Sequence, residues 1–178
     1  LVQAVDITDR ITSEEALRES EYRLRSFIEN TADAVILIDE EGEIIEWNPA
    51  AERISGILKD EARGMKAWDI MSRMMLPERK TRHHLEEMEA RIKESLKTGI
   101  PASQQPVISE IIGPDGLTRY IRQVTFPIPT SKGYRFGIII EDITRQKITE
   151  EQAERNLLNL QRSQSIAHVG TWTLDIAT

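Results

Sequence analysis

The chain of 178 residues contains no cysteine, which excludes disulfide bonds, zinc-thiolate sites and thiol nucleophiles. It also lacks a signal peptide and any apolar run long enough to cross a bilayer. Basic residues are outnumbered, with 23 Lys and Arg against 30 Asp and Glu, and the net charge is −7. Because binding to phosphate groups needs a basic patch, this balance argues against a nucleic-acid or anionic-membrane partner. A reducing compartment is permitted, and we expect a cytoplasmic protein.

The patterns of common catalytic sites are missing as well. There is no Ser/His/Asp arrangement and no phosphate-binding glycine loop. Neighbouring carboxylates such as Glu86 and Glu87 fit a charged helix face without catalysis. We therefore expect no catalytic residue, no metal site and no enzyme activity in this chain.

A short motif occurs twice in the chain. Asp6-Ile7-Thr8 returns as Asp142-Ile143-Thr144, an offset of 136 residues (142 − 6), and each copy precedes a Thr-led, Glu-rich segment. These segments, Thr12 to Glu15 and Thr149 to Gln152, have the spacing of a capping box, which predicts a helix start at each. One complete module therefore lies between two copies of the same exit motif, the Asp-Ile-Thr segment that leads from the end of a module into a helix.

Two charged linker helices are predicted to flank this module, over residues 9–33 and 145–165. Both carry apolar stripes with spacings of 3 and 4, typical of a short coiled coil. The stripe residues are Leu17 and Leu24 in the first helix, and Ala153, Leu157 and Leu160 in the second. For the first helix, packing on its own domain fits the pattern as well as pairing with a second chain. We expect a homodimer through the linker helices.

The module itself reads as two strands, a set of helices and three strands. A hairpin is predicted over 35–47, after which Asn48 caps and Pro49 opens a short helix. A longer helix is predicted from Pro77 to about Lys97. Three strands then form a predicted antiparallel meander, over residues 107–112, 118–128 and 134–141. The last strand is apolar at 136–140 on both faces, and we expect burial on both.

This order of elements resembles a PAS domain of the signalling type. The most specific parts are NPAAER at 48–53, after the first hairpin, and DIT at 142–144, after the last strand. The resemblance covers Ala34 to Thr144. It implies an α+β fold with a five-stranded antiparallel sheet, helices over one face and often a small cavity, here flanked by N- and C-terminal linker helices.

The resemblance also interprets the two ends of the chain. Residues 1–8 would be the tail of an upstream PAS module, and residues 166–178 would open a downstream one, with Asp175 in the place of Asp39. Such tandem arrays are similar to the input halves of bacterial and archaeal sensor histidine kinases. The expected partners are therefore neighbouring PAS modules and the output domain of the same chain, besides a small-molecule ligand.

The family motif implies a role for Asp142, Ile143 and Thr144 at the end of the last strand. In similar domains this motif resembles a clamp between the core and the output helix, and it would transmit the signal here. Local capping of the helix start is a compatible alternative.

A ligand pocket is expected between the helices and the sheet, although the sequence does not name its ligand. Alternation along the strands and the stripe of the long helix predict the residues that face it. They are Ile36, Ile38, Met71, Leu85, Val124 and Ile138.

Two cofactor classes can be weighed against the residues. An adduct-forming flavin needs a cysteine in the early helices, and the chain has none. A haem needs an axial histidine, and the resemblance implies one near the C-terminal end of the long helix. His83 and His84 stand near the start of that helix and point about 100° apart, so haem is disfavoured.

These features together predict a PAS sensory or regulatory module of a multidomain signal-transduction protein, with a sensor histidine kinase of a two-component system as parent. It would relay a ligand- or partner-induced change through its helical linkers in a dimer. Two alternatives stay open: a structural spacer and dimerisation module without ligand, and a redox or gas sensor that holds haem or another cofactor. A diguanylate cyclase or chemoreceptor output is also compatible with the sequence.

Overall fold

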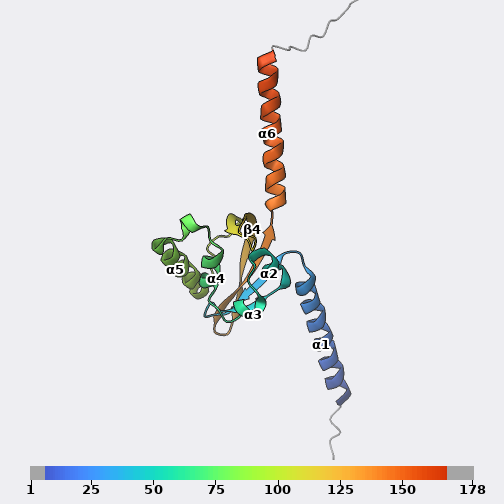
Figure 1. Cartoon of the computed structure of the whole chain (residues 1–178). Coiled ribbons are helices and arrows are strands. Elements are labelled where there is room, and N and C mark those ends of the chain that lie inside the picture. Colours follow the sequence, from blue (N-terminus) through green and yellow to red (C-terminus); the bar gives the residue numbers. More distant parts are fainter. Residues whose placement is uncertain (1–6, 168–178) are drawn as a thin grey trace, which may run out of the picture. The chain divides into compact units, whose positions relative to one another are not determined.

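The computed structural model describes residues 7–167 (Figure 1). They belong to two compact units, Leu1–Asp142 and Ile143–Thr178, which are treated separately below. Residues 168–178 of the predicted downstream module and residues 1–6 of the upstream tail lie outside the described residues. No described helix is both long enough and apolar enough to span a bilayer.

The first unit begins with one long helix, followed by two strands, a run of helices and three more strands. In chain order they are α1 (Ile7–Asn30), β1 (Ala34–Ile38), β2 (Ile44–Trp47), α2 (Pro49–Ser55), α3 (Lys59–Ala62), α4 (Ala67–Met74), the 3₁₀ helix η1 (Pro77–Arg79), α5 (Arg82–Thr98), β3 (Val107–Ile112), β4 (Thr118–Thr130) and β5 (Gly133–Asp142). The second unit contains α6 (Thr144–Ala167).

The five strands form one antiparallel sheet in the order β2-β1-β5-β4-β3. The last strand in the sequence, β5, therefore lies at the centre, where it pairs with β1 on one side and β4 on the other. This arrangement confirms the expected α+β fold with a five-stranded antiparallel sheet.

The hairpin of β1 and β2 follows from its turn chemistry. One carboxylate oxygen of Asp39 accepts hydrogen bonds from the backbone N–H groups of Glu41 (3.0 Å) and Glu43 (2.8 Å). Gly42 then takes a positive φ of 80°, which a residue with a side chain adopts only with strain. The tight turn brings Ile44 opposite Ile38, and both side chains enter the core.

Large apolar side chains from the inner face of the sheet and from the helices over it form the core. Trp47, Ile70 and Phe136 are each no more than 2% exposed. The indole N–H of Trp47 donates to the carbonyl of Ile57 at 3.0 Å, so burial leaves no unpaired donor on this side chain.

Asn48 is fully buried and joins three elements through its side chain. Its Oδ1 accepts from the backbone N–H of Ala51, in the first turn of α2, and from that of Val35 in β1, both at 3.0 Å. Its Nδ2 donates to the carbonyl of Ile28, near the end of α1 (2.9 Å), and to that of Asp33 (3.0 Å). One side chain thus caps the start of one helix and the end of another.

The predicted helix starts at Thr12 and Thr149 are wrong. α1 already begins at Ile7, and α6 begins at Thr144, five residues before Thr149. The first α6 hydrogen bond runs from the N–H of Lys147 to the carbonyl of Ile143 (2.9 Å), directly after the strand. The hydroxyl of Thr149 donates to the carbonyl of Arg145 (2.8 Å), so it sits inside the helix and does not cap it.

Two further expectations need correction. The long helix does not run continuously from Pro77, because η1 ends at Arg79 and α5 begins at Arg82, with the hydroxyl of Thr81 accepting from the N–H of His84 (3.3 Å). β5 is not buried on both faces, since the side chain of Ile139 is 37% exposed. The rule for strands covered on both faces was applied to a sheet whose outer face is partly open.

The connections of Asn48 predict a large loss of stability on truncation. We expect Asn48→Ala to lower the free energy of unfolding by roughly 3 kcal/mol, because it removes a cap and leaves buried backbone groups unpaired. Denaturant unfolding followed by circular dichroism measures this loss. Asn30→Ala is the matched control: Asn30 is exposed and donates only within α1, so its loss should be within about 0.5 kcal/mol. Equal losses in the two variants would show that the hydrogen bonds of Asn48 contribute no more to stability than those of an exposed asparagine.

Candidate functional site

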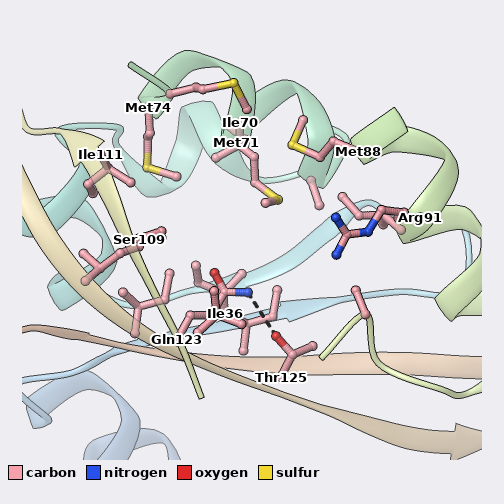
Figure 2. Close-up of a pocket in the computed structure, with 18 of the residues that line it drawn as sticks. Ile36, Ile70, Met71, Met74, Met88, Arg91, Ser109, Ile111, Gln123 and Thr125 are labelled. Carbon is pink, nitrogen blue, oxygen red and sulfur yellow. Dashed lines mark hydrogen bonds between the residues drawn. The ribbon is translucent and has the colours of Figure 1, made fainter. Parts of the chain in front are cut away.

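A cavity of about 330 Å³ lies between the helices α4 and α5 and the inner face of the sheet (Figure 2). Its size is at the lower end of the range typical of small-molecule sites. β1 and β5 contribute isoleucines, among them Ile36 and Ile138, and the helices contribute methionines, among them Met71 and Met88. Because methionine side chains are flexible and polarizable, this part of the lining can adapt to the shape of an occupant.

The predicted pocket residues divide into two groups. Four of them line the cavity, namely Ile36, Ile38, Met71 and Ile138. Val124 does not, because its side chain lies on the outer face and is 41% exposed. Alternation along β4 was assigned one residue out of register, and Gln123 and Thr125 point inward instead.

Leu85 also lies away from the cavity lining, and its side chain is only partly buried. It shares one side of α5 with Ile92, which does line the cavity, but it lies two turns earlier in the helix. The residues His84 and Met88 reach the cavity in its place.

The lining contains polar groups that an expectation based on apolar alternation missed. The amide nitrogen of Gln123 donates to the hydroxyl of Thr125 at 3.0 Å, across the inner face of β4 (Figure 2). Ser109 on β3, and Arg91 and Ser95 on α5, also line the cavity. Gln123 and Thr125 are two residues apart in a strand, and Arg91 and Ser95 are four residues apart in a helix. Applied to polar residues, this periodicity could have identified them from the sequence.

His83 and His84 both fall in the first turn of α5, and both are exposed. His84 lines the cavity and His83 does not. Within residues 7–167 no three His, Asp or Glu side chains gather in a way that could hold a metal ion.

The end of β5 is connected to α2 through one arginine. Arg119 on β4 forms an ion pair with Asp142 (Nη1 to Oδ2, 3.7 Å), the last residue of β5. The same Nη1 donates to the carbonyl of Arg53 at the end of α2 (3.0 Å), and Nη2 donates to Asp115 (3.5 Å). The hydrogen bond from the N–H of Leu117 is the main cause that lowers the pKa of Asp115 below its ordinary value, and Arg119 adds to it.

The other members of the predicted exit motif belong to the second unit. Ile143 is 2% exposed and its carbonyl accepts the first hydrogen bond of α6. Thr144 is the first residue of that helix.

The other end of β5 is held by a carboxylate. Glu40 accepts hydrogen bonds from the hydroxyl of Thr130 (2.7 Å) and from Nε of Arg135 in β5 (3.0 Å), and its side chain is only 10% exposed. The hydrogen bond from Thr130, with those from its own backbone and from Arg135, lowers the pKa of Glu40 from 4.5 to about 2. β5 is thus tied by charged groups at its start and at its end.

The predicted stripe residues of the linker helices have exposed side chains. Leu17 and Leu24 in α1 are each 61% exposed, and Leu157 and Leu160 in α6 are each 60% exposed. Ala153 is exposed as well. These side chains are available for contact with another chain.

The family model for the PAS domain matches residues 32–145, more than half of the sequence. The chain belongs to the PAS domain family. The match contains the whole sheet, the cavity and Asp142, Ile143 and Thr144. Membership supports a role in sensing and signalling, which is the general role of PAS domains.

The chain is similar to proteins from several organisms. Sporulation kinase E of Bacillus subtilis (strain 168) is 34% identical over 67 residues, which cover 38% of this chain and only 9% of the kinase. The PAS domain of an HTR-like protein from Haloarcula marismortui has a TM-score of 0.54 at 20% identity, covering 74% of this chain and 98% of that one. A sensory box histidine kinase/response regulator from Burkholderia thailandensis E264 has a TM-score of 0.51 at 17% identity, covering 79% and 98%. The two structures support the fold alone.

The lowered pKa of Glu40 predicts a pH-dependent contribution to stability. The folded state binds the proton less tightly than the unfolded chain, so the stabilisation is complete above about pH 4.5 and is lost as the pH falls through about 2. Glu40→Gln should therefore lower the unfolding midpoint at pH 7, and the difference from the wild type should shrink below pH 4.5. Thermal unfolding across this pH range tests it. Glu41→Gln, an exposed neighbour, should show little difference at any pH; a pH-independent effect of Glu40→Gln would contradict the ionic cause.

Proposed function

We propose that this PAS domain is the sensory module of a multidomain sensor histidine kinase in the cytoplasm, and that it passes a change in its cavity to α6. One observation carries the proposal: the strand that lines the cavity with Phe136, Ile138 and Ile140 is the strand that continues through Asp142 into α6. The likeness to Sporulation kinase E supports a kinase as the parent protein. The module itself has no kinase activity.

The relay would work as a shift between two arrangements of the sheet and of the exit motif at residues 142–144. A ligand moves this balance only by the difference in its affinity for the two states. Contact with Ile138 at the centre of β5 would change the position of the strand, and the ion pair of Asp142 with Arg119 would be made or lost at its end. Asp142, Ile143 and Thr144 act in this scheme as the transmission residues.

A homodimer would form through the linker helices. The exposed leucines of α6 recur at the spacing of a coiled coil, and burying them against a second copy would remove apolar surface from water. Rotation or tilt of the paired helices would then carry the signal to the neighbouring modules and the output domain.

A purely structural spacer is less well supported, because a filled core would suffice for that role. The cavity of about 330 Å³ and its polar lining residues favour a site that is occupied by a ligand.

The relay predicts that filling the cavity alters α6. We expect Ile138→Phe to change the opening free energy of amides in the first turns of α6 by about 0.5–2 kcal/mol. Hydrogen–deuterium exchange on the full chain measures it. Ile139→Phe is the matched control, because this neighbour in β5 points to the outer face. If both variants leave exchange in α6 unchanged, the cavity and the helix are not coupled.

The proposed dimer predicts that a charge placed in the leucine stripe of α6 weakens self-association. Leu157→Glu should weaken self-association of the full chain roughly tenfold or more, because a carboxylate would be buried in the apolar seam. Light scattering over a concentration series measures the dissociation constant. Asn159→Glu adds the same charge about 200° around the helix and should leave association nearly unchanged. A monomeric wild type, or equal weakening by both substitutions, would rule out pairing through this stripe.

A further inference from the structure

Arg91 is a cation at the cavity that has no hydrogen-bond or ion-pair partner within residues 7–167. It lies in the middle of α5, and its guanidinium is directed toward the cavity (Figure 2). Its side chain makes no hydrogen bond and no ion pair with the part of the chain that the structure describes, whereas Arg79, the other lining arginine, faces Glu110 at 3.8 Å. An unpaired guanidinium beside an apolar cavity is ready to bind an anion.

A second donor stands next to Arg91 on the same helix face. Ser95 follows four residues later, also lines the cavity, and its hydroxyl has no partner among the described residues. Residues four apart on a helix are neighbours on its surface. A guanidinium and a hydroxyl side by side can together bind the two oxygens of a carboxylate.

The charges around the cavity leave one competing interpretation. Glu87 lines the cavity one turn before Arg91 and forms no ion pair within the described residues, so it could attract a cationic ligand instead. One observation favours the anion: the guanidinium of Arg91 points into the cavity (Figure 2). The hydroxyl of Ser95 can then serve an anion as a second donor.

The rest of the lining fits a flexible apolar chain. Met71, Met74 and Met88 cover the side of the cavity formed by the helices, opposite Ile36 on the sheet (Figure 2). Flexible thioethers adapt to the changing outline of an alkyl chain, whereas a rigid planar ring calls for a fixed slot. Arg91 is itself exposed, so an anionic head group bound there would keep contact with water.

We propose that the cavity binds an amphipathic carboxylate, with the carboxylate held by Arg91 and Ser95 and the alkyl chain lying beneath the methionines. The inference deepens the proposed function, on which it rests for the role of the cavity as a ligand site. It names the chemical class of the ligand and the residues that select its charge.

Calorimetric titration of the full chain with three probes of equal chain length tests the head group. The probes are decanoate and decylammonium below their micelle concentrations, and decanol below its solubility limit. Decanoate should bind most tightly. Arg91→Gln should weaken decanoate binding about tenfold or more and leave decanol binding unchanged, because only the charged head group loses a charge-assisted hydrogen bond. Lys97→Gln removes the same charge from α5 outside the cavity lining and should change neither.

Several outcomes would overturn this inference. No heat with decanoate would exclude the ligand class, and tighter binding of decylammonium would assign the site to Glu87. Equal weakening by Arg91→Gln and Lys97→Gln would show a general charge effect. Failure of the proposed function looks different: decanoate would bind through Arg91 but leave hydrogen exchange in α6 unchanged. Conversely, absent decanoate binding with coupling of Ile138→Phe to α6 would reject only the ligand class.

Discussion

The buried amide of Asn48 is the contact on which the arrangement of the first unit depends. Its four side-chain hydrogen bonds reach α1, the residue before β1, β1 itself and α2, with no exposed surface to offer water as a substitute partner. Among side chains, only an amide can donate two hydrogen bonds and accept two. Since Pro49 opens α2 directly afterwards, the position of the hairpin and the direction of α2 are fixed together.

The central place of β5 makes this strand the common member of the sheet, the cavity and the exit. Its partners on both sides hold it along most of its length, and Gly137 leaves room for the ring of Phe126 on the outer face. A Cβ at Gly137 would overlap that ring, so the strand is also supported from the face opposite the cavity. A displacement of the backbone at Ile138 is therefore restrained by a neighbouring strand on each side, whereas an edge strand would be restrained on one side only.

Much of the fold could be predicted from the sequence, because local chemistry specified it. The hairpin, the cap at Asn48 and the end of α5 at Gly99 each depend on residues within a few positions. The predictions that were wrong concerned features that depend on tertiary context. Thr149 has a good capping pattern, but the backbone already turns helical at Thr144; Val124 was placed by alternation, and only the pairing of β4 with β5 fixes that Gln123 and Thr125 face inward. The polar side of the cavity was missed because only apolar residues were used to trace the inner faces, and the tertiary structure alone determines whether Arg91 has a partner within residues 7–167.

The composition of α6 makes it sensitive to what happens at its ends. It is a 24-residue helix with several exposed leucines, and an isolated helix draws little stability from propensity alone. Most of its support must come from burying those leucines or from the strand that starts it. The pairs of Arg155 with Glu151 and of Lys147 with Glu150 lie on its surface and contribute only tenths of a kcal/mol each, about 0.3–0.5 for such pairs. A helix so weakly stabilised by itself would respond to displacement of the strand that precedes it and to any partner, as the proposed relay requires.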